Sequence, residues 1–490
     1  MEYFLKREAC CGQISLKLSK LIIMKKTILL TLLALAPIFA GAVELNEIYY
    51  TLDYNAKTAT VTGCDYYTGS ASIPSTITYE GETYTVTSIA ENAFYEHNYL
   101  SAVNLPNTIT TIGKSAFFGC KVLVTVNIPD AVKVIETATF GSCKKLTTVV
   151  IGMNSTLTTL KKNAFKTCWD LKSLYLPNTL TTIEEAVFEN SGLTSITIPA
   201  SVTTISDRTF YGSNLNSITI PSSVTSIGEW AFGKCISLTT IDLGTSVQTI
   251  GKSAFQESGL TSITIPNSVT TIDTGVFMKC NELQSVEWGK SLTTIPDYTF
   301  EECLKLQSVI IPTSVTEIGY RAFYSCHKLE SINIPNSVTS IAYYAFQYCG
   351  LTSLNLPNSL TSCDYSFIAC TGLTQVTIPS SLTSLYNTFQ DCNNLINVTV
   401  LATTPPSILT GTFSKWDATL HVLPGCGEAY KNAYGWEKFA NIAEDATTDI
   451  GIQPTIISNK ENVYYDLRGN QLTHPEKGLY IINSKKIIVK

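Results

Sequence analysis

The sequence predicts a mainly-β repeat solenoid, and three observations lead to this fold class. Phenylalanine recurs fourteen times between Phe94 and Phe389, at intervals of 21 to 25 residues. Most intervals carry the same two stretches, L-x-x-I-x-I-P and V-T-x-I. Charged residues make up 15% of the chain and hydrophobic residues 44%, so Ser, Thr and Asn must cover much of the surface. We expect about 14 coils of about 23 residues, stacked so that they share one continuous core.

The first stretch of each unit predicts a strand with one buried face, because its apolar residues alternate with polar ones. In the unit 193–213 we expect apolar side chains to point inward and hydroxyl side chains outward: Leu193, Ile196 and Ile198 inward, Ser195 and Thr197 outward. The proline that follows, here Pro199, ends the strand because it has no N–H to donate to a continuing ladder.

The rest of the unit predicts a shorter extended segment and a return. The V-T-x-I stretch, for example 202–205, is the extended segment. The A-F-x-x-C stretch is expected to bury its aromatic ring in a short helical or irregular return. Ten of the fifteen cysteines follow a repeat phenylalanine by three residues: Cys120, Cys143, Cys168, Cys235, Cys280, Cys303, Cys326, Cys349, Cys370 and Cys392.

Serine replaces this cysteine in some units, as at Ser191, Ser213 and Ser258. The exchange favours a small buried position over a metal ligand. Neighbouring thiols would lie about one strand spacing, ~4.8 Å, apart, which permits a disulfide by distance. A parallel ladder of identical side chains does not supply the sulfur torsion of a disulfide. We therefore expect a buried thiol ladder, with disulfides as the alternative.

The pattern I-P-x-S-V-T-x-I-G-x-x-A-F-x-x-C resembles the BspA-like subclass of leucine-rich repeats over residues 45–445. The resemblance implies a right-handed leucine-rich-repeat array at 94–396. It also implies an N-terminal cap and lead-in at 43–93 and a closing unit at 397–445. Members of this family are typically surface or secreted proteins, several of them implicated in adhesion and in binding host proteins. Adhesion is implied by the resemblance alone, because a fold does not determine a function.

The first 42 residues resemble an export signal rather than part of the fold. Lys25 and Lys26 precede the apolar run 28–39, which ends in Ala40-Gly41-Ala42. This order is typical of a signal peptide at 24–42, cleaved between Ala42 and Val43. The alternative, a transmembrane anchor, needs about 20 apolar residues. We interpret 1–23 as lying upstream of the true translation start.

The C-terminal segment departs from the repeat. After a linker at 446–461, the strand-like runs of 462–490 flank two turns, 468–470 and 483–484. This tail resembles the sorting signal of type IX secretion cargo, in the stretches Asp466-Leu467-Arg468-Gly469, Lys477-Gly478-Leu479-Tyr480 and Val489-Lys490. The resemblance implies recognition by the secretion machinery. The alternative is a small hairpin without a sorting role.

We find no motif for catalysis, for a cofactor or for a metal. The four histidines, His97, His327, His421 and His474, are dispersed, so we expect no enzyme. Without the four net positive charges of 1–42, the remainder carries a formal charge of −10. An acidic chain without a basic cluster argues against nucleic acid and against an anionic membrane surface as partners.

The outward residues of the strands form the surface best suited to binding. Most are Ser, Thr or Asn, for which solubility is a sufficient explanation. Four break this pattern and are our candidate ligand contacts: Tyr175, Asp242, Glu287 and Ile310. The sequence thus predicts a secreted or surface-exposed bacterial adhesion scaffold that binds host extracellular proteins or glycans, without cofactor or transmembrane span. The alternative is a structural surface or matrix component without a specific ligand.

Overall fold

The computed structural model describes residues 42–64 and 69–447, together with the strands 464–465, 471–472, 478–482 and 485–489. Outside these residues lie the stretch 1–23, nearly all of the signal peptide, most of the linker and the two turns predicted in the tail. The chain forms two compact units, Met1–Thr182 and Ile183–Lys490. The predicted mainly-β solenoid is confirmed, with about 17 turns rather than 14.

The first unit begins with antiparallel strands and continues with stacked coils. Strands β1 to β3 and the hairpin β5–β6 are antiparallel, while β3 pairs in parallel with β6. Their bounds are β1 (Ala42–Leu45), β2 (Ile48–Asp53), β3 (Thr58–Cys64), β5 (Thr76–Tyr79) and β6 (Glu82–Ile89). Val43, the predicted first residue after cleavage, lies in β1 opposite Tyr50 and is buried.

Each coil of the first unit contributes one strand to each of two parallel rows. The I-x-I stretches form a first row of β4 (Gly69–Ser72), β7 (Leu100–Asn104), β9 (Thr125–Ile128) and β11 (Thr148–Ile151). The V-T-x-I stretches form a second row of β8 (Thr111–Ile112), β10 (Val134–Ile135) and β12 (Thr159–Leu160). Strand β13 (Thr182–Ile183) spans the residues at which the first unit ends.

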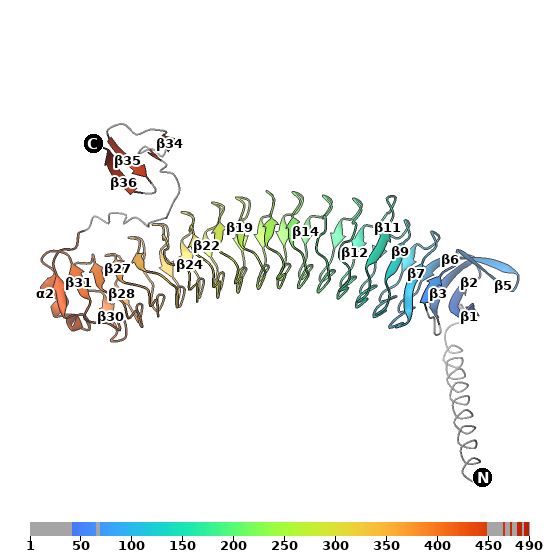
Figure 1. Cartoon of the computed structure of the whole chain (residues 1–490), viewed down its shortest axis with the longest axis horizontal. Helices are drawn as coiled ribbons and strands as arrows, with labels where there is room; N and C mark the ends of the chain where they lie inside the picture. The colour runs from blue at the N-terminus through green and yellow to red at the C-terminus, as the bar shows by residue number, and fades with distance from the viewer. Residues whose placement is uncertain are drawn as a thin grey trace, which may run out of the picture. The chain divides into compact units, whose positions relative to one another are not determined.

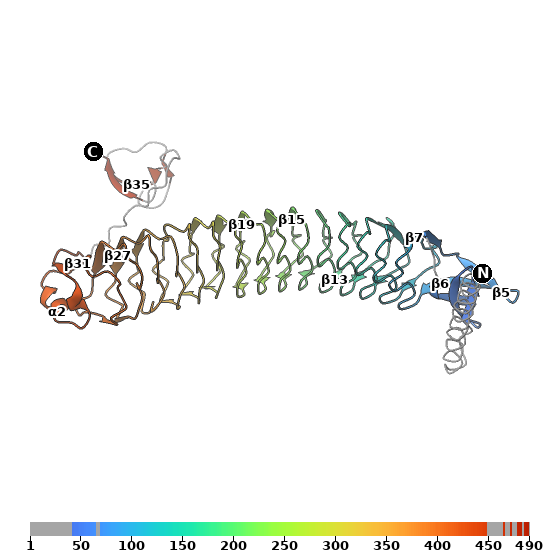
Figure 2. The same ribbon diagram turned by 60° about the horizontal axis from the view of Figure 1, so that its bottom comes forward.

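The second unit repeats the arrangement over more coils, which Figure 1 shows following one another from β14 to β31. Strands β15, β19 and β27 of its first row follow one edge in Figure 2. The whole row consists of β15 (Ser217–Thr219), β17 (Thr240–Asp242), β19 (Ser262–Thr264), β21 (Ser285–Glu287), β23 (Ser308–Val309), β26 (Ser353–Asn355), β27 (Gln375–Ile378), β29 (Asn397–Val400), β31 (Thr419–Val422) and β32 (Asn441–Ala443). In the unit 193–213, Leu193 and Ile198 are buried as predicted, Ile196 is only half-buried, and Ser195 and Thr197 are exposed. No first-row strand is assigned there.

The second row of this unit is made of two-residue strands. They are β14 (Thr204–Ile205), β16 (Ser226–Ile227), β18 (Thr249–Ile250), β20 (Thr271–Ile272), β22 (Thr294–Ile295), β24 (Glu317–Ile318), β25 (Ser340–Ile341), β28 (Ser384–Leu385) and β30 (Ser407–Ile408). In each strand the isoleucine or leucine is buried and the other residue faces outward. This alternation is the one expected of a strand with one face on a core.

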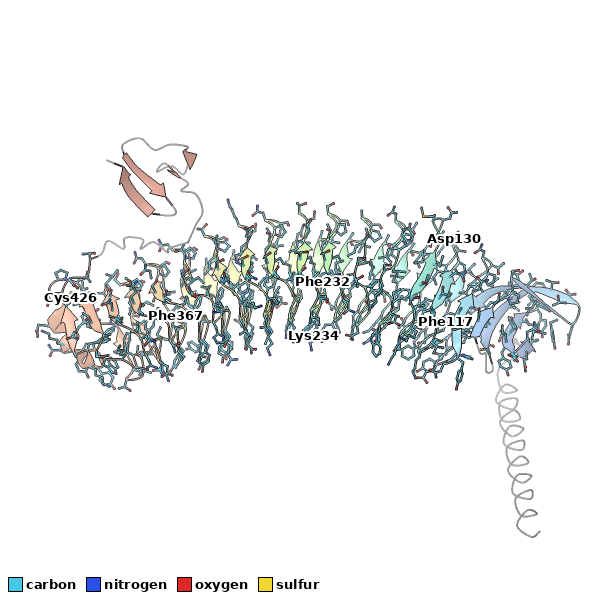
Figure 3. All side chains as sticks on the ribbon, in the orientation of Figure 1. Phe117, Asp130, Phe232, Lys234, Phe367 and Cys426 are labelled. Carbon is cyan, nitrogen blue, oxygen red and sulfur yellow. The ribbon has the colours of Figure 1, made fainter. Side chains whose placement is uncertain are left out.

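The repeat phenylalanines form the centre of the core. In the second unit, Phe210, Phe232 and Phe255 are fully buried, and their rings stack with centroids 5.4 and 5.5 Å apart. Figure 3 labels three repeat phenylalanines, Phe117 in the first unit and Phe232 and Phe367 in the second. Phe413 continues the stack at 5.7 Å from Phe389, although no A-F-x-x-C motif surrounds it. The coil of Phe413 is therefore one that the estimate of 14 left out.

The returns are irregular turns, so the helical alternative is wrong for the described coils. Most returns contain two residues with positive φ, located two positions before and two positions after the phenylalanine. In the coil of Phe165 these are Asn163, at φ 61°, and Thr167, at φ 62°. Glycine occupies the later position in two other coils, as Gly119 and Gly212. Left-handed backbone costs a residue with a Cβ about 1–2 kcal/mol, which the buried ring must offset.

The described helices belong to the closing unit. They are α2 (Gly427–Lys431) and the 3₁₀ turn η1 (Trp436–Lys438). The Tyr430 hydroxyl donates to the carbonyl of Ala402 at 2.8 Å, and the Trp436 indole N–H donates to that of Pro406 at 2.8 Å. The tail contains antiparallel strands, β33 (Tyr464–Tyr465), β34 (Gln471–Leu472), β35 (Gly478–Ile482) and β36 (Lys485–Val489).

Candidate functional site: the outward face of the first row

The outward side chains of the first row in the second unit form a surface that we call the strand face. Its central column includes Thr219, Asp242, Thr264, Glu287 and Ile310. The register pairs Thr219 with Asp242 and Thr264 with Glu287. Parallel strands lie about 4.8 Å apart, so this column presents one exposed side chain at each such step. The residue types in this column therefore determine the charge and polarity that the surface presents to a partner.

Much of the Ser and Thr content serves contacts between coils. The hydroxyls of Thr239 and Thr261 each donate to a main-chain carbonyl one coil earlier, at 3.3 Å in both cases. The serine of the P-x-S-V stretch does the same, since Ser223 donates to Val202 at 2.6 Å and Ser359 to Val338 at 2.7 Å. The carbonyls of Asn216 and Thr239 also accept the main-chain N–H of the same threonine, so each threonine hydroxyl adds a second bond between coils. The hydroxyl-rich composition therefore has a structural role besides solubility.

Three of the four candidate contacts lie on the strand face. Ile310 is 76% exposed, although isoleucine is usually buried, and it forms a bridge with Asn333 of the next coil. Glu287 is exposed and accepts a hydrogen bond from the hydroxyl of Thr264 at 3.3 Å. Strands β21 and β23 pair directly, so Glu287 and Ile310 belong to neighbouring coils.

The side chain of Asp242 is exposed and also has a structural role. Its Oδ1 accepts the main-chain N–H of Gly244 at 2.9 Å, which holds the turn after β17. Gly244 takes φ 63° there, where other units carry proline. One carboxylate oxygen of Asp242 is thus engaged in the turn, and the aspartate adds negative charge to the strand face beside Thr219.

Tyr175 belongs to the first unit, whereas the other three candidates belong to the second. It is 48% exposed, and no strand is assigned to its stretch, 171–177. Val150, the outward residue of β11 in the preceding coil, is 53% exposed. Val150 and Tyr175 give the first unit an apolar outward surface that differs from the acidic and aliphatic one of the second unit.

The repeat cysteines are buried, as predicted, and each has a partner that the sequence did not reveal. The Cys235 thiol donates to the carbonyl of Phe210 at 3.0 Å, and the Cys280 thiol donates to that of Phe255 at 3.0 Å. Burial raises the pKa of both thiols to about 11. None of these ten repeat cysteines forms a disulfide in this structure. Their arrangement suits packing rather than nucleophilic chemistry, which needs the thiolate.

The returns carry ion pairs that sequence reasoning missed. Arg208 binds both carboxylate oxygens of Glu189 at 3.1 Å and lies 4.2 Å from the centre of the Tyr211 ring. The same arrangement recurs later, where Arg321 contacts Glu301 at 3.3 Å and lies 4.4 Å from the Tyr324 ring. A sequence pattern could have predicted both ion pairs. The stretch R-x-F-Y occurs at 208–211 and at 321–324, and in each case Glu follows the repeat phenylalanine of the preceding coil.

A polar cluster at the C-terminal end of the strand face was also missed. His421 Nδ1 lies 2.7 Å from Asp445 Oδ1, and its Nε2 lies 3.1 Å from Asn397 Oδ1. The cluster ties β31 to β29 and to the segment after β32. Within 42–64 and 69–447, no group of three or more His, Cys, Asp or Glu side chains is arranged to hold a metal ion.

Comparison with known proteins decides the family. The family model described as the BspA type leucine-rich repeat region matches at 87–216, 203–330 and 316–421, in six copies. The chain belongs to this family. A leucine-rich repeat protein from Bacteroides ovatus ATCC 8483 is 29% identical, with a TM-score of 0.67 over 73% of this chain and 94% of that one. No curated protein matches the chain.

Two further solved structures resemble this BspA-type chain. A leucine-rich cell surface protein from Faecalibacterium prausnitzii A2-165 is 26% identical, with a TM-score of 0.45 over 74% of this chain and 96% of that one. The pneumococcal vaccine antigen PcpA is 20% identical, with a TM-score of 0.43 over 84% of this chain and 100% of that one. Among the described residues of the BspA-type chain, no helix is both long and apolar enough to span a bilayer.

Proposed function

We propose that this BspA-type protein is an exported scaffold that binds host extracellular proteins or glycans at the bacterial surface. The observation that carries the proposal is the exposed column Asp242, Thr264, Glu287 and Ile310 on the strand face. A specific protein interface buries about 800 Å² on each partner, which one coil cannot supply. A repeated surface supplies it by adding coils, and many copies per cell multiply weak contacts.

The side chains of this column support binding rather than catalysis. Ile310 presents an apolar group in water, and Glu287 beside it presents a carboxylate. An apolar contact flanked by a charge is a common composition of an interface core and its rim. We propose that Tyr175 adds a separate aromatic contact in the first unit, since tyrosine is enriched among residues that dominate binding energy. The proposed function needs no cofactor.

The proposal that the protein is exported is based on the signal peptide and on the tail. We propose that the signal peptide is cleaved before Val43 and that the tail 462–490 is recognised by the type IX secretion machinery. Edman sequencing of the surface-exposed protein checks the first point, with Val43-Glu44-Leu45 as the expected N-terminus. A chain that retains Met24 at the surface contradicts it.

Solid-phase binding to a panel of extracellular matrix proteins and host glycans tests the proposed function. We expect saturable binding to at least one member, reduced when Tyr175, Asp242, Glu287 and Ile310 are replaced together by Ser or Thr. Glu302→Gln on a return is the matched control and should bind normally, with the fold of both variants checked by circular dichroism. A flat response over the whole panel supports the structural surface component instead. Unchanged affinity in the combined variant refutes the strand face as the site.

A further inference from the structure

A hollow of about 370 Å³ lies in the second unit beside the second-row strands β24 and β25. Ile341 and Ala342 are among the residues that line it. The interval from Phe346 to Phe367 is 21 residues, the shortest in the array. In place of a strand pair, Ser340 forms a single bridge with Ser362 of this short coil. We attribute the hollow to the shortening, since Ser362 and Asp364 both line it.

Tyr320 and Tyr343 contribute aromatic rings to the hollow. Tyr343 is 54% exposed, and its ring meets the edge of the Tyr365 ring with centroids 5.4 Å apart at 62°. The neighbouring tyrosine therefore supports Tyr343 on one side while more than half of the residue stays in solvent. A supported, exposed tyrosine offers a large contact area at a small cost in conformational entropy.

The charges around the hollow are negative. Glu317 and Asp364 line it, and no lining residue is basic. Neither carboxylate forms an ion pair with any residue in the described part of the chain. Asp364 Oδ1 accepts the main-chain N–H of Tyr386 at 2.8 Å, which fixes the carboxylate without neutralising it.

The nearest arginine in the sequence is already engaged. Arg321 follows Tyr320, but its guanidinium contacts Glu301 at 3.3 Å and lies 4.4 Å from the Tyr324 ring centre. It therefore balances Glu301 rather than Glu317 or Asp364. Arg321 also lies 5.5 Å from the centre of the Tyr320 ring, so Tyr320 already has a cation beside it. Tyr343, Glu317 and Asp364 do not receive one from this arginine.

We propose that this hollow binds the side chain of an arginine or lysine in an exposed segment of a partner protein. The aliphatic stem would lie along Tyr343 and the charged head would reach Glu317, since cations bind both aromatic faces and carboxylates. Asp364, two coils from Glu317 in the register, adds a second negative charge to the hollow. The volume is at the low end of the range of about 300–1,000 Å³ for ligand sites, which fits one side chain. A neutral sugar stacked on Tyr343 would leave both carboxylates without a cation.

This site goes beyond the proposed function, because it lies on the second row and the returns rather than on the strand face. The full-length protein is titrated with a short fluorescent peptide that contains arginine, and with the same peptide carrying neutral citrulline instead. Fluorescence anisotropy should show saturable binding of the arginine peptide and weaker binding of the citrulline peptide. Added salt should weaken the arginine complex, because the pair of charges is near the surface.

Three variants locate the site. Glu317→Thr copies Thr294 of the preceding coil, and Tyr343→Ser removes the aromatic ring. Each should lower the affinity for the arginine peptide about fivefold, as expected for losing one partner of a cation. Glu302→Gln on a return, which does not line the hollow, is the matched control and should leave the affinity unchanged. Denaturation midpoints close to that of the parent protein confirm that the variants fold.

Three outcomes overturn the proposal. Equal affinity for the arginine and citrulline peptides removes the cation from the explanation. Unchanged binding in Glu317→Thr shows that the peptide sits elsewhere. Saturable binding of maltoheptaose that is lost in Tyr343→Ser, with no binding of the arginine peptide, identifies the hollow as a carbohydrate site. None of these results bears on the strand face, whose four-residue variant is measured separately.

Discussion

The thiol of Cys303 donates a hydrogen bond to the main-chain carbonyl of Phe277, one coil earlier, at 3.0 Å. Both residues are fully buried. The same relationship joins Cys120 to Phe94 and Cys392 to Phe367. The carbonyl of Phe277 also accepts the main-chain N–H of Cys280 at 3.0 Å, so the thiol uses its second lone pair and the cysteine does more than fill space. Serine at this position has a different partner, since the hydroxyls of Ser213 and Ser258 lie 3.4 and 3.3 Å from the thiols of Cys235 and Cys280 in the next coil.

Replacing Cys303 should reveal the value of this bond. Cys303→Ala removes the second hydrogen bond to the carbonyl of Phe277 and opens a small cavity, so we expect a loss of about 1–2 kcal/mol in the free energy of unfolding. Cys303→Ser keeps a donor and should lose less. Urea denaturation followed by circular dichroism provides the midpoints of both variants. Equal midpoints for Ala and Ser would show that the hydrogen bond contributes nothing.

Alkaline pH should destabilise the array through its buried thiols. Burial raises the pKa of Cys235 and Cys280 to about 11, whereas an unfolded thiol has a pKa of about 8.5. Between these values the unfolded chain has lost protons that the folded chain still holds, so the free energy of unfolding decreases as pH rises. The contribution is fully present below about pH 8 and falls by about 1.4 kcal/mol per pH unit for each thiol.

The double variant Cys235→Ser and Cys280→Ser isolates this effect from the titration of lysines and tyrosines. Its denaturation midpoint should fall less steeply between about pH 9 and pH 11 than that of the parent protein. Parallel curves for the two proteins would exclude these thiols as the cause of alkaline destabilisation.

Relieving the left-handed backbone of one return should stabilise the first unit. Thr167 is β-branched and has φ 62°, and Gly119 and Gly212 occupy the equivalent position in other coils. Thr167→Gly removes a strain of about 1–2 kcal/mol, partly offset by the greater entropy of glycine in the unfolded chain. We expect a net gain of about 0.5–1 kcal/mol, measured by thermal denaturation.

Lys166→Gly is the matched control, because Lys166 precedes Thr167 and is absent from the positive-φ residues. It should destabilise the unit by about 0.5–1 kcal/mol, the usual effect of glycine at an ordinary φ. A loss of stability in both variants would mean that Thr167 makes contacts that outweigh its strain.

Deleting 462–490 should separate folding from sorting. Repeats contact mainly their neighbours, and the closing unit already covers the last coil, so the truncated protein should keep its denaturation midpoint. We expect it to be missing from the cell surface if the tail is the sorting signal. Surface display at the normal level would refute the sorting role, and a lowered midpoint would identify the tail as a structural cap.

The sequence predicted those features of the fold that each coil repeats. The buried positions of Phe232 and Cys235 follow from a period that a single residue type reveals. The contacts that depend on differences between coils were not predicted. The pairing of Arg208 with Glu189 joins residues 19 positions apart, and only the stacking register shows that they meet. The hollow beside Tyr343 similarly depends on one coil that is shorter than its neighbours.

The candidate contacts were predicted to differing degrees. The alternation of the strand correctly placed Asp242, Glu287 and Ile310 on the outward side, since register alone determines which face a side chain occupies. It could not indicate that Gly244 engages a carboxylate oxygen of Asp242, because that contact depends on the φ of the turn. Nor could it place the boundary between the two units after Thr182, since the Phe period continues across it.

The donors of Tyr430 and Trp436 reach back to carbonyls of the preceding chain at Ala402 and Pro406, as Cys303 reaches back to Phe277. The closing unit thus occupies the place that a further repeat would take. It meets the last repeat through the same parallel pairing that joins the repeats to one another, β29 with β27 and β30 with β28, so whole coils can be duplicated or lost in evolution while one terminal segment continues to fit. The number of repeats can then vary among descendants of one gene, and with it the length over which the protein meets its surroundings.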